Sequence, residues 1–220
     1  MASMGRAEVM RDYGGISAED RRAERRRKLL EAGRQMWGES GLADVTVRGI
    51  CASSGLTPRY FYEHFPNREA LVVAVADELY DELFEVLVSA SLAESGELED
   101  KLRAALKALL DAIGDDPQIH RILTSDWNGV PGLVKRRTKT LDVITDLVLQ
   151  YGAELLDFEP ESAETMRRGA LFVVGGVNQL IEEWLRDPKE STAELAEICT
   201  WLCLTVVKAG QAEAARDTAR

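Results

Sequence analysis

Apolar residues recur along this chain with the period of an α-helix, and no stretch alternates as a half-buried β-strand does. The first periodic segment is expected to form a helix over about residues 20–39, with Gly41 as its end. The apolar face of this helix consists of Leu29, Leu30, Gly33, Met36 and Trp37. The same period in later segments predicts an all-α fold of about nine helices.

Two short helices are expected next. One begins after Thr46 and ends at Gly55, and the other begins at Thr57-Pro58 and is stopped by Pro66. A threonine at the N-cap can accept from free backbone amides, and proline fits the first helical position because its missing N–H is not needed there. Three short helices with a tight turn between the second and third predict a helix-turn-helix.

The remaining chain is expected to form a larger helical bundle. Asn67 caps a long fourth helix, and further starts are indicated at Gly96, at Asp116-Pro117 and near Pro131. The last two helices follow these, and their patterns are the clearest of the chain. They are expected over about 161–186 and from the capping box at 191–194 to about residue 209.

The chain therefore divides into four expected segments. They are a disordered arm (1–19), a helix-turn-helix domain (20–66), a helical bundle (67–210) and a disordered tail (211–220).

Charge is distributed unevenly between these segments. The whole chain has 27 Lys and Arg against 38 Asp and Glu, a net charge of -11. Residues 1–70 hold 12 basic and 10 acidic residues, which leaves 15 basic and 28 acidic residues in 71–220. Because the acidic part would repel a polyanion, any nucleic acid is expected to dock on the N-terminal part alone.

Composition argues against several classes of protein. No apolar run approaches the ~18 residues of a membrane span, and the first twenty residues lack the apolar segment of a signal peptide. Three cysteines favour a reducing compartment, so a cytoplasmic protein is expected. Cys199 and Cys203 share a helix face but have no histidine nearby in sequence, which favours core packing over metal or redox chemistry. Neither a metal nor a cofactor is expected.

The third helix, over 57–65, carries rings and cations on different faces. Phe61 and Phe65 are four residues apart and are expected to face the core, leaving the N-terminal residues exposed. The residues expected to face DNA bases are Pro58, Arg59 and Tyr60. Side chains that donate hydrogen bonds suit the flanking phosphates, and these are Thr46, Thr57, Tyr62, His64 and Arg68.

A set of short motifs lies across this region. They are Ala32-Gly33, Trp37, Gly41, Val45-Thr46-Val47 with Ile50 and Ala52, Gly55-Leu56, and YEHFPNREAL over 62–71. Together they resemble the tetracycline-repressor (TetR) family of bacterial transcription regulators, over about a fifth of the chain. The resemblance implies the same division into base-facing and phosphate-contacting residues.

Two positions depart from the family's usual pattern. Arg68 stands where the family usually has lysine, which keeps the charge but changes its reach and geometry. Gly49 replaces a better helix former and is expected to weaken the second helix by roughly 1 kcal/mol relative to Ala.

The resemblance also implies a two-fold dimer built on the last two helices and a small-molecule effector in the bundle. The expected dimer seam consists of Gly169, Val173, Gly176, Val177 and Leu180, and a monomeric core explains the same pattern. The candidate pocket residues are Trp127, Tyr151, Phe172, Asn178 and Trp184, although aromatic residues of a bundle also serve as core.

The function expected from these patterns is a ligand-responsive repressor that binds a palindromic operator, with homodimer, operator DNA and effector as partners and no membrane. An activator would use the same dimer. A helical enzyme, or a regulator whose N-terminal module binds protein instead of DNA, would also fit an all-α pattern. Catalysis is not expected, since the chain has no phosphate loop, metal cluster or nucleophile motif.

Several residue roles have structural alternatives. Tyr62 and His64 could close the junction to the fourth helix, and Arg59 and Tyr60 could be solvated surface. The basic cluster of the first helix could contact phosphate or the minor groove, or could be a solvated face. Its members are Arg21, Arg22, Arg25, Arg26, Arg27 and Lys28.

Overall fold

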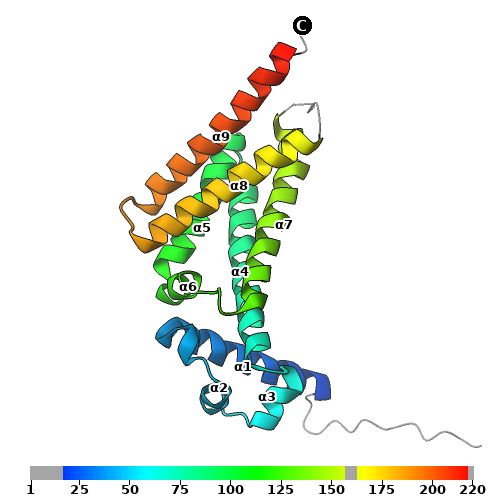
Figure 1. The fold of residues 1–220 in the computed structure, drawn as a ribbon, viewed down its shortest axis with the longest axis vertical. Helices are drawn as coiled ribbons and strands as arrows, with labels where there is room; N and C mark the ends of the chain where they lie inside the picture. The colour runs from blue at the N-terminus through cyan, green and yellow to red at the C-terminus, as the bar shows by residue number, and fades with distance from the viewer. Residues whose placement is uncertain (1–16, 157–162, 218–220) are drawn as a thin grey trace, which may run out of the picture.

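The computed structural model describes residues 17–156 and 163–217, in which all regular structure is helical. Figure 1 shows a small group of helices at the foot of the molecule and a taller bundle above it. The all-α prediction is confirmed. No helix in the described ranges is long and apolar enough to cross a membrane.

The foot of the molecule contains helix α1 (Ala18–Ser40), a 3-10 turn (Leu42–Asp44), α2 (Val47–Ser54) and α3 (Pro58–His64). A capping box that the periodic pattern did not reveal starts α1, since the Ser17 and Asp20 side chains each accept from the other's backbone N–H. Gly55 has φ 67°, a left-handed conformation that favours glycine, and it ends α2 where expected.

The start of α3 differs in one detail from the expectation. The structure places Thr57 at the N-cap and Pro58 at the first helical position, but the Thr57 side chain makes no cap hydrogen bond. By contrast, Thr46 caps α2 by accepting from the Gly49 amide at 3.1 Å. The Thr57 hydroxyl is therefore not used to satisfy the end of its own helix.

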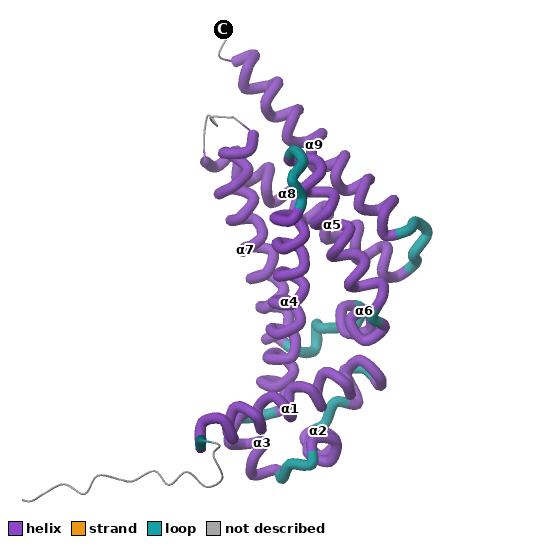
Figure 2. The backbone as a smooth tube through the Cα atoms, turned by 180° about the vertical axis from the view of Figure 1, so that it is seen from behind, coloured by secondary structure: helices purple, strands orange, loops and turns teal. Residues whose placement is uncertain are grey.

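The upper bundle consists of α4 (Arg68–Ala93), α5 (Leu98–Asp115), α6 (Pro117–Leu123), α7 (Pro131–Leu156), α8 (Ala163–Arg186) and α9 (Thr192–Asp217). Helix α4 runs from the foot into the bundle, where α5 and α7 pack against it (Figure 2). The predicted caps are present, including Asn67 on the Ala70 amide at 2.8 Å and the Ser191–Glu194 capping box.

Helix α9 is longer than expected. Its sequence predicted an end near residue 209 and a disordered tail, whereas the helix continues to Asp217. The added residues are rich in alanine and charged helix formers, whose high helix propensity explains why the helix continues.

One buried core runs from the foot into the bundle. Trp37 of α1 donates its indole N–H to the Ser125 hydroxyl at 2.8 Å, and its ring lies 6.1 Å from that of Trp127. Trp127 in turn makes an edge-to-face contact with Tyr80 of α4 at 5.8 Å. The core therefore ties α1 to the bundle through the segment between α6 and α7.

Candidate nucleic-acid interface

Helix α3 has one buried face and one exposed face. Phe61 and Phe65 are both buried, with their rings 5.9 Å apart. On the other side, Arg59 has 86% of its side chain exposed, and Tyr60 and Tyr62 are 37% and 58% exposed. Half of the rings in this segment thus serve the core and the other half are open to solvent, as the sequence predicted.

The Arg59 guanidinium makes only a weak ion pair within the protein. Its Nε lies 3.2 Å from the Glu63 carboxylate one turn along the helix. An exposed pair of this kind contributes about 0–1 kcal/mol and is screened by salt. Pro58 beside it is also exposed. These side chains are consequently available to another molecule at the foot of the protein.

Arg68 has a different environment from the one expected of a phosphate contact. It is half-buried, and its guanidinium donates to the backbone carbonyls of Leu42 and Val45. These carbonyls belong to the 3-10 turn and the segment leading into α2. Arg68 therefore joins the start of α4 to the start of α2, a role that the YEHFPNREAL pattern did not reveal because it depends on a contact distant in sequence.

His64 lies at the end of α3 and is half-buried. Burial lowers the pKa of His64, and the nearby positive charges of Arg22, Arg25 and Arg26 lower it further. Its buried Nε2 has no hydrogen-bond partner among the described residues. Burial and the neighbouring arginines therefore both favour the neutral form of the ring.

The basic cluster of α1 divides between two faces of the helix. Arg27 pairs with Glu24 at 2.9 Å and with Glu31 at 3.1 Å, while Lys28 lies 3.7 Å from Glu24. Arg25 and Arg26 instead lie over rings of the α3 segment. The first group is a solvated face, and the second group extends the surface around α3.

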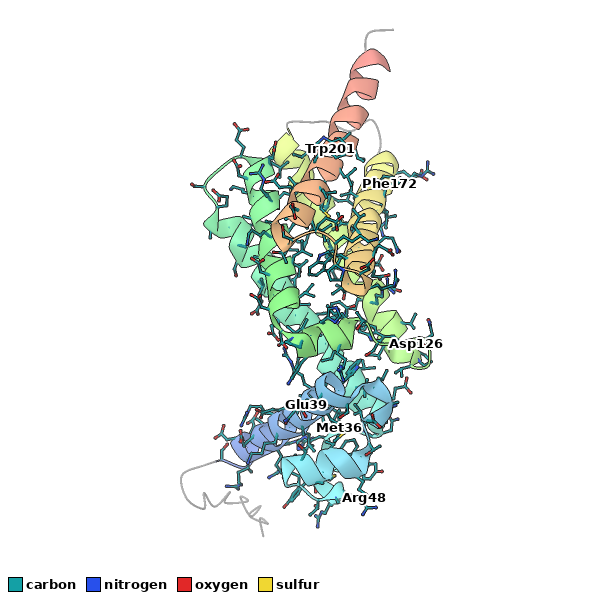
Figure 3. The ribbon with its side chains drawn as sticks, turned by 90° about the vertical axis from the view of Figure 1, so that its left-hand side faces the viewer. Met36, Glu39, Arg48, Asp126, Phe172 and Trp201 are labelled. Carbon is teal, nitrogen blue, oxygen red and sulfur yellow. The ribbon has the colours of Figure 1, made fainter. Side chains whose placement is uncertain are left out.

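The sequence did not indicate one further cation at the foot of the molecule as a DNA contact. Arg48 of α2 is exposed and lies at the lower end of the molecule (Figure 3). Thr46 and Thr57, at the starts of α2 and α3, are also exposed. Exposed basic or hydroxyl-bearing side chains therefore lie on α1, on α2 and at the starts of α2 and α3.

The four pocket candidates whose side chains the structure describes have different environments. Trp127 is buried against Trp37 and Tyr80, and Trp184 is buried with its indole N–H donating to the Glu190 carbonyl at 2.9 Å. Asn178 donates to Glu182 at 3.0 Å. Phe172 was expected inside the bundle but is 70% exposed on α8 because its helix face has no covering element among the described residues. The Tyr151 side chain lies outside the described residues.

The dimer candidates occupy two faces of α8. Val177 and Leu180 pack partly against the core, and Val173 is half-buried. A Cβ built on Gly169 or Gly176 would meet no described atom within 4 Å, so both glycines face open space. Large apolar side chains lie exposed on α8 and α9, and these are Leu171, Phe172, Ile198, Trp201 and Leu202. The sequence singled out only Phe172 of this set, and as a pocket residue.

The cysteines have no chemical partners in the described chain. Cys199 and Cys203 are buried, and burial raises the pKa of each thiol to about 11. They are therefore protonated at neutral pH. Within the described ranges no three His, Cys, Asp or Glu residues are grouped as a metal site would need.

Comparisons with known proteins agree with this geometry. The sequence pattern described as "Bacterial regulatory proteins, tetR family" matches residues 29–75, which run from the middle of α1 into α4. A transcriptional regulator from Rhodococcus sp. Rha1 has a similar fold, with TM-score 0.65 and 20% identity over 82% of this chain and 96% of that one.

Two further structures are similar. A tetR-family transcriptional regulator from Streptomyces coelicolor has TM-score 0.69 and 16% identity over 87% of this chain and 83% of that one. The multidrug binding protein EbrR, solved with imidazole, has TM-score 0.63 and 16% identity over 81% of this chain and 94% of that one. Residues 29–75 therefore match the TetR family of transcription regulators, and the helices of the chain are arranged as in these solved structures.

Proposed function

We propose that this protein binds operator DNA through α3 and the basic surface around it. The observation that supports this best is the exposed face of α3, where Arg59 and two tyrosines face solvent in a chain of net charge -11. An acidic protein has little reason to concentrate exposed cations at one end unless that end meets an anion.

Roles within the surface follow from exposure. Pro58, Arg59 and Tyr60 face bases, because a recognition helix inserts its N-terminal residues into the major groove. Thr46, Thr57, Tyr62 and His64 contact phosphates. Arg68 acts through the backbone carbonyls that it holds, and so supports Thr46 instead of reaching a phosphate itself.

The protein acts as a two-fold dimer through α8 and α9. The support is the exposed apolar surface of these helices, together with glycines that face open space and lower helix stability by roughly 1 kcal/mol each relative to Ala. A second copy packing closely on them offsets that cost. Two α3 helices about 34–36 Å apart would then read the two halves of a palindrome.

A small molecule bound in the bundle releases the operator. The fold is shared with the multidrug binding protein EbrR, which was solved with imidazole. Compounds that raise the melting temperature of this protein should weaken its binding to DNA by about 5- to 150-fold, since the effector and operator favour different states.

The central experiment is selection of duplexes from a random DNA pool by the purified protein. We expect a palindromic sequence to be enriched, with an affinity that falls as salt rises because cations on the protein displace counterions from phosphates. If no sequence is enriched, the proposed function is wrong. The position of the selected site relative to a promoter then distinguishes a repressor from an activator.

A further inference from the structure

The N-terminal turns of α1 continue its buried face beyond the end of the core. Arg25 and Arg26 lie one turn before Leu29 and Leu30, which are both buried. The side of α1 that packs on the core is therefore extended by two arginines, and this extension lies against the α3 segment.

The two arginines cover rings with different environments. The Arg26 guanidinium lies 4.9 Å from the ring centre of Phe65, which is buried. The Arg25 guanidinium lies 4.8 Å from the ring centre of Tyr60, which is partly exposed among the side chains proposed to face bases. Arg26 thus covers the core, whereas Arg25 holds a ring of the DNA surface.

Arg25 makes no ion pair within the described residues. It is half-buried, and its Nε is inaccessible to solvent without a hydrogen-bond partner there. Arg27, two positions along, has the same charge but is exposed and paired with Glu24 and Glu31. The stack on Tyr60 is the contact that distinguishes Arg25 from its neighbour.

We propose that Arg25 is a specificity-determining positioning residue, which fixes the Tyr60 ring in one orientation for contact with a base. The proposal rests on the function proposed above and adds a residue of α1 to base recognition by α3. A planar guanidinium stacked on one ring face restricts both side-chain torsions of the tyrosine. Tyr60 then meets DNA with less conformational freedom to lose.

The test uses the full-length protein with two probes: the duplex enriched from random DNA, and the same duplex with its bases shuffled. We expect Arg25→Ala to lower the ratio of the two affinities by about two- to five-fold per half-site. Arg27→Ala, the matched charge control, should leave the ratio unchanged. Arg25→Lys retains the charge without the planar group, so it should lower the ratio of the two affinities by less than Arg25→Ala does.

A double-mutant cycle separates positioning from a simple charge effect. If Arg25 acts through Tyr60, Arg25→Ala added to Tyr60→Leu should lower the ratio no further than Tyr60→Leu alone. Equal loss of affinity for both duplexes, or additive effects in the double variant, would overturn the proposal. If the wild type enriches a sequence but the variants give either of these results, the proposed function still holds and only the role of Arg25 is wrong.

Discussion

At the scale of single residues, Arg59 near the start of α3 and Arg68 at the start of α4 have opposite environments. Arg59 is almost fully exposed, whereas Arg68 donates to the Leu42 and Val45 carbonyls. Both are cations beside a helix-turn-helix in the sequence, and the sequence pattern assigned both to DNA. The two arginines differ because the fold brings the carbonyls of Leu42 and Val45, which are far from Arg68 in sequence, within reach of its guanidinium.

Replacing Arg68 tests this difference. Arg68→Lys keeps the charge but cannot donate in the same forked geometry, so we expect the free energy of unfolding to fall by about 1–3 kcal/mol in urea titrations. The control is Arg48→Lys, at an exposed site on the same surface, which should leave stability unchanged. Wild-type stability for Arg68→Lys would argue for a plain phosphate contact.

The environment of His64 predicts a dependence of stability on pH. Burial, and then the charges of Arg22, Arg25 and Arg26, lower the pKa of His64 in the folded chain, so the unfolded chain binds a proton more readily. The contribution of neutral His64 to stability is therefore full above the ordinary pKa of about 6.5, and it is lost as the pH falls from there through the lower pKa of His64 in the folded chain.

His64→Gln should remove this contribution. The free energy of unfolding, measured in urea at about pH 7.5 and about pH 5.5, should fall less in the variant than in the wild type. An identical fall in both proteins would show that His64 is not the group responsible.

At the scale of helices, close contacts decide how α1 meets the bundle. A Cβ on Gly38 would lie 2.5 Å from the Gln118 Cβ of α6, and the Arg121 guanidinium donates to the Glu39 carbonyl nearby. The sequence predicted both helices, with Gly41 as the end of α1 and Asp116-Pro117 as the start of α6, because these signals depend on local residues. It did not predict their contact, since neither glycine nor glutamine carries a signal for a distant partner.

Substitution at this contact should be costly. Gly38→Ala forces α1 and α6 apart, and we expect a loss of about 1–3 kcal/mol in the free energy of unfolding. Gly114→Ala is the control, because its nearest contact is an ordinary 3.4 Å from the Trp184 ring. That variant should be neutral or gain up to about 1 kcal/mol from helix propensity. Equal effects at both glycines would contradict close packing at Gly38.

At the scale of the whole molecule, the exposed apolar side chains of α8 and α9 predict the oligomeric state. Trp201 is 65% exposed and Phe172 is 70% exposed, both in the upper part of the molecule, far from Arg48 at its foot (Figure 3). Burying such rings in a second copy is more favourable than hydrating them. We therefore expect a dimer with its DNA surface at the opposite end.

Charged substitutions test the dimer. Trp201→Glu should shift the sedimentation coefficient from that of a dimer toward that of a monomer and weaken operator binding. Leu92→Glu, on α4, replaces an apolar side chain that is 78% exposed and should leave the dimer intact. A monomeric wild type, or dissociation by both variants, would show that α8 and α9 are not the interface.

The sequence by itself determined the helices, most of their caps, the helix-turn-helix and the separation of a basic foot from an acidic bundle. Each of these depends on residues within a few turns of one another or on summed charge, which sequence displays directly. The tertiary structure decided that Arg68 holds a loop, that Arg25 stacks on Tyr60 and that Phe172 faces outward. Those outcomes depend on which helix faces meet, and the energy of such contacts belongs to pairs of residues far apart in the chain.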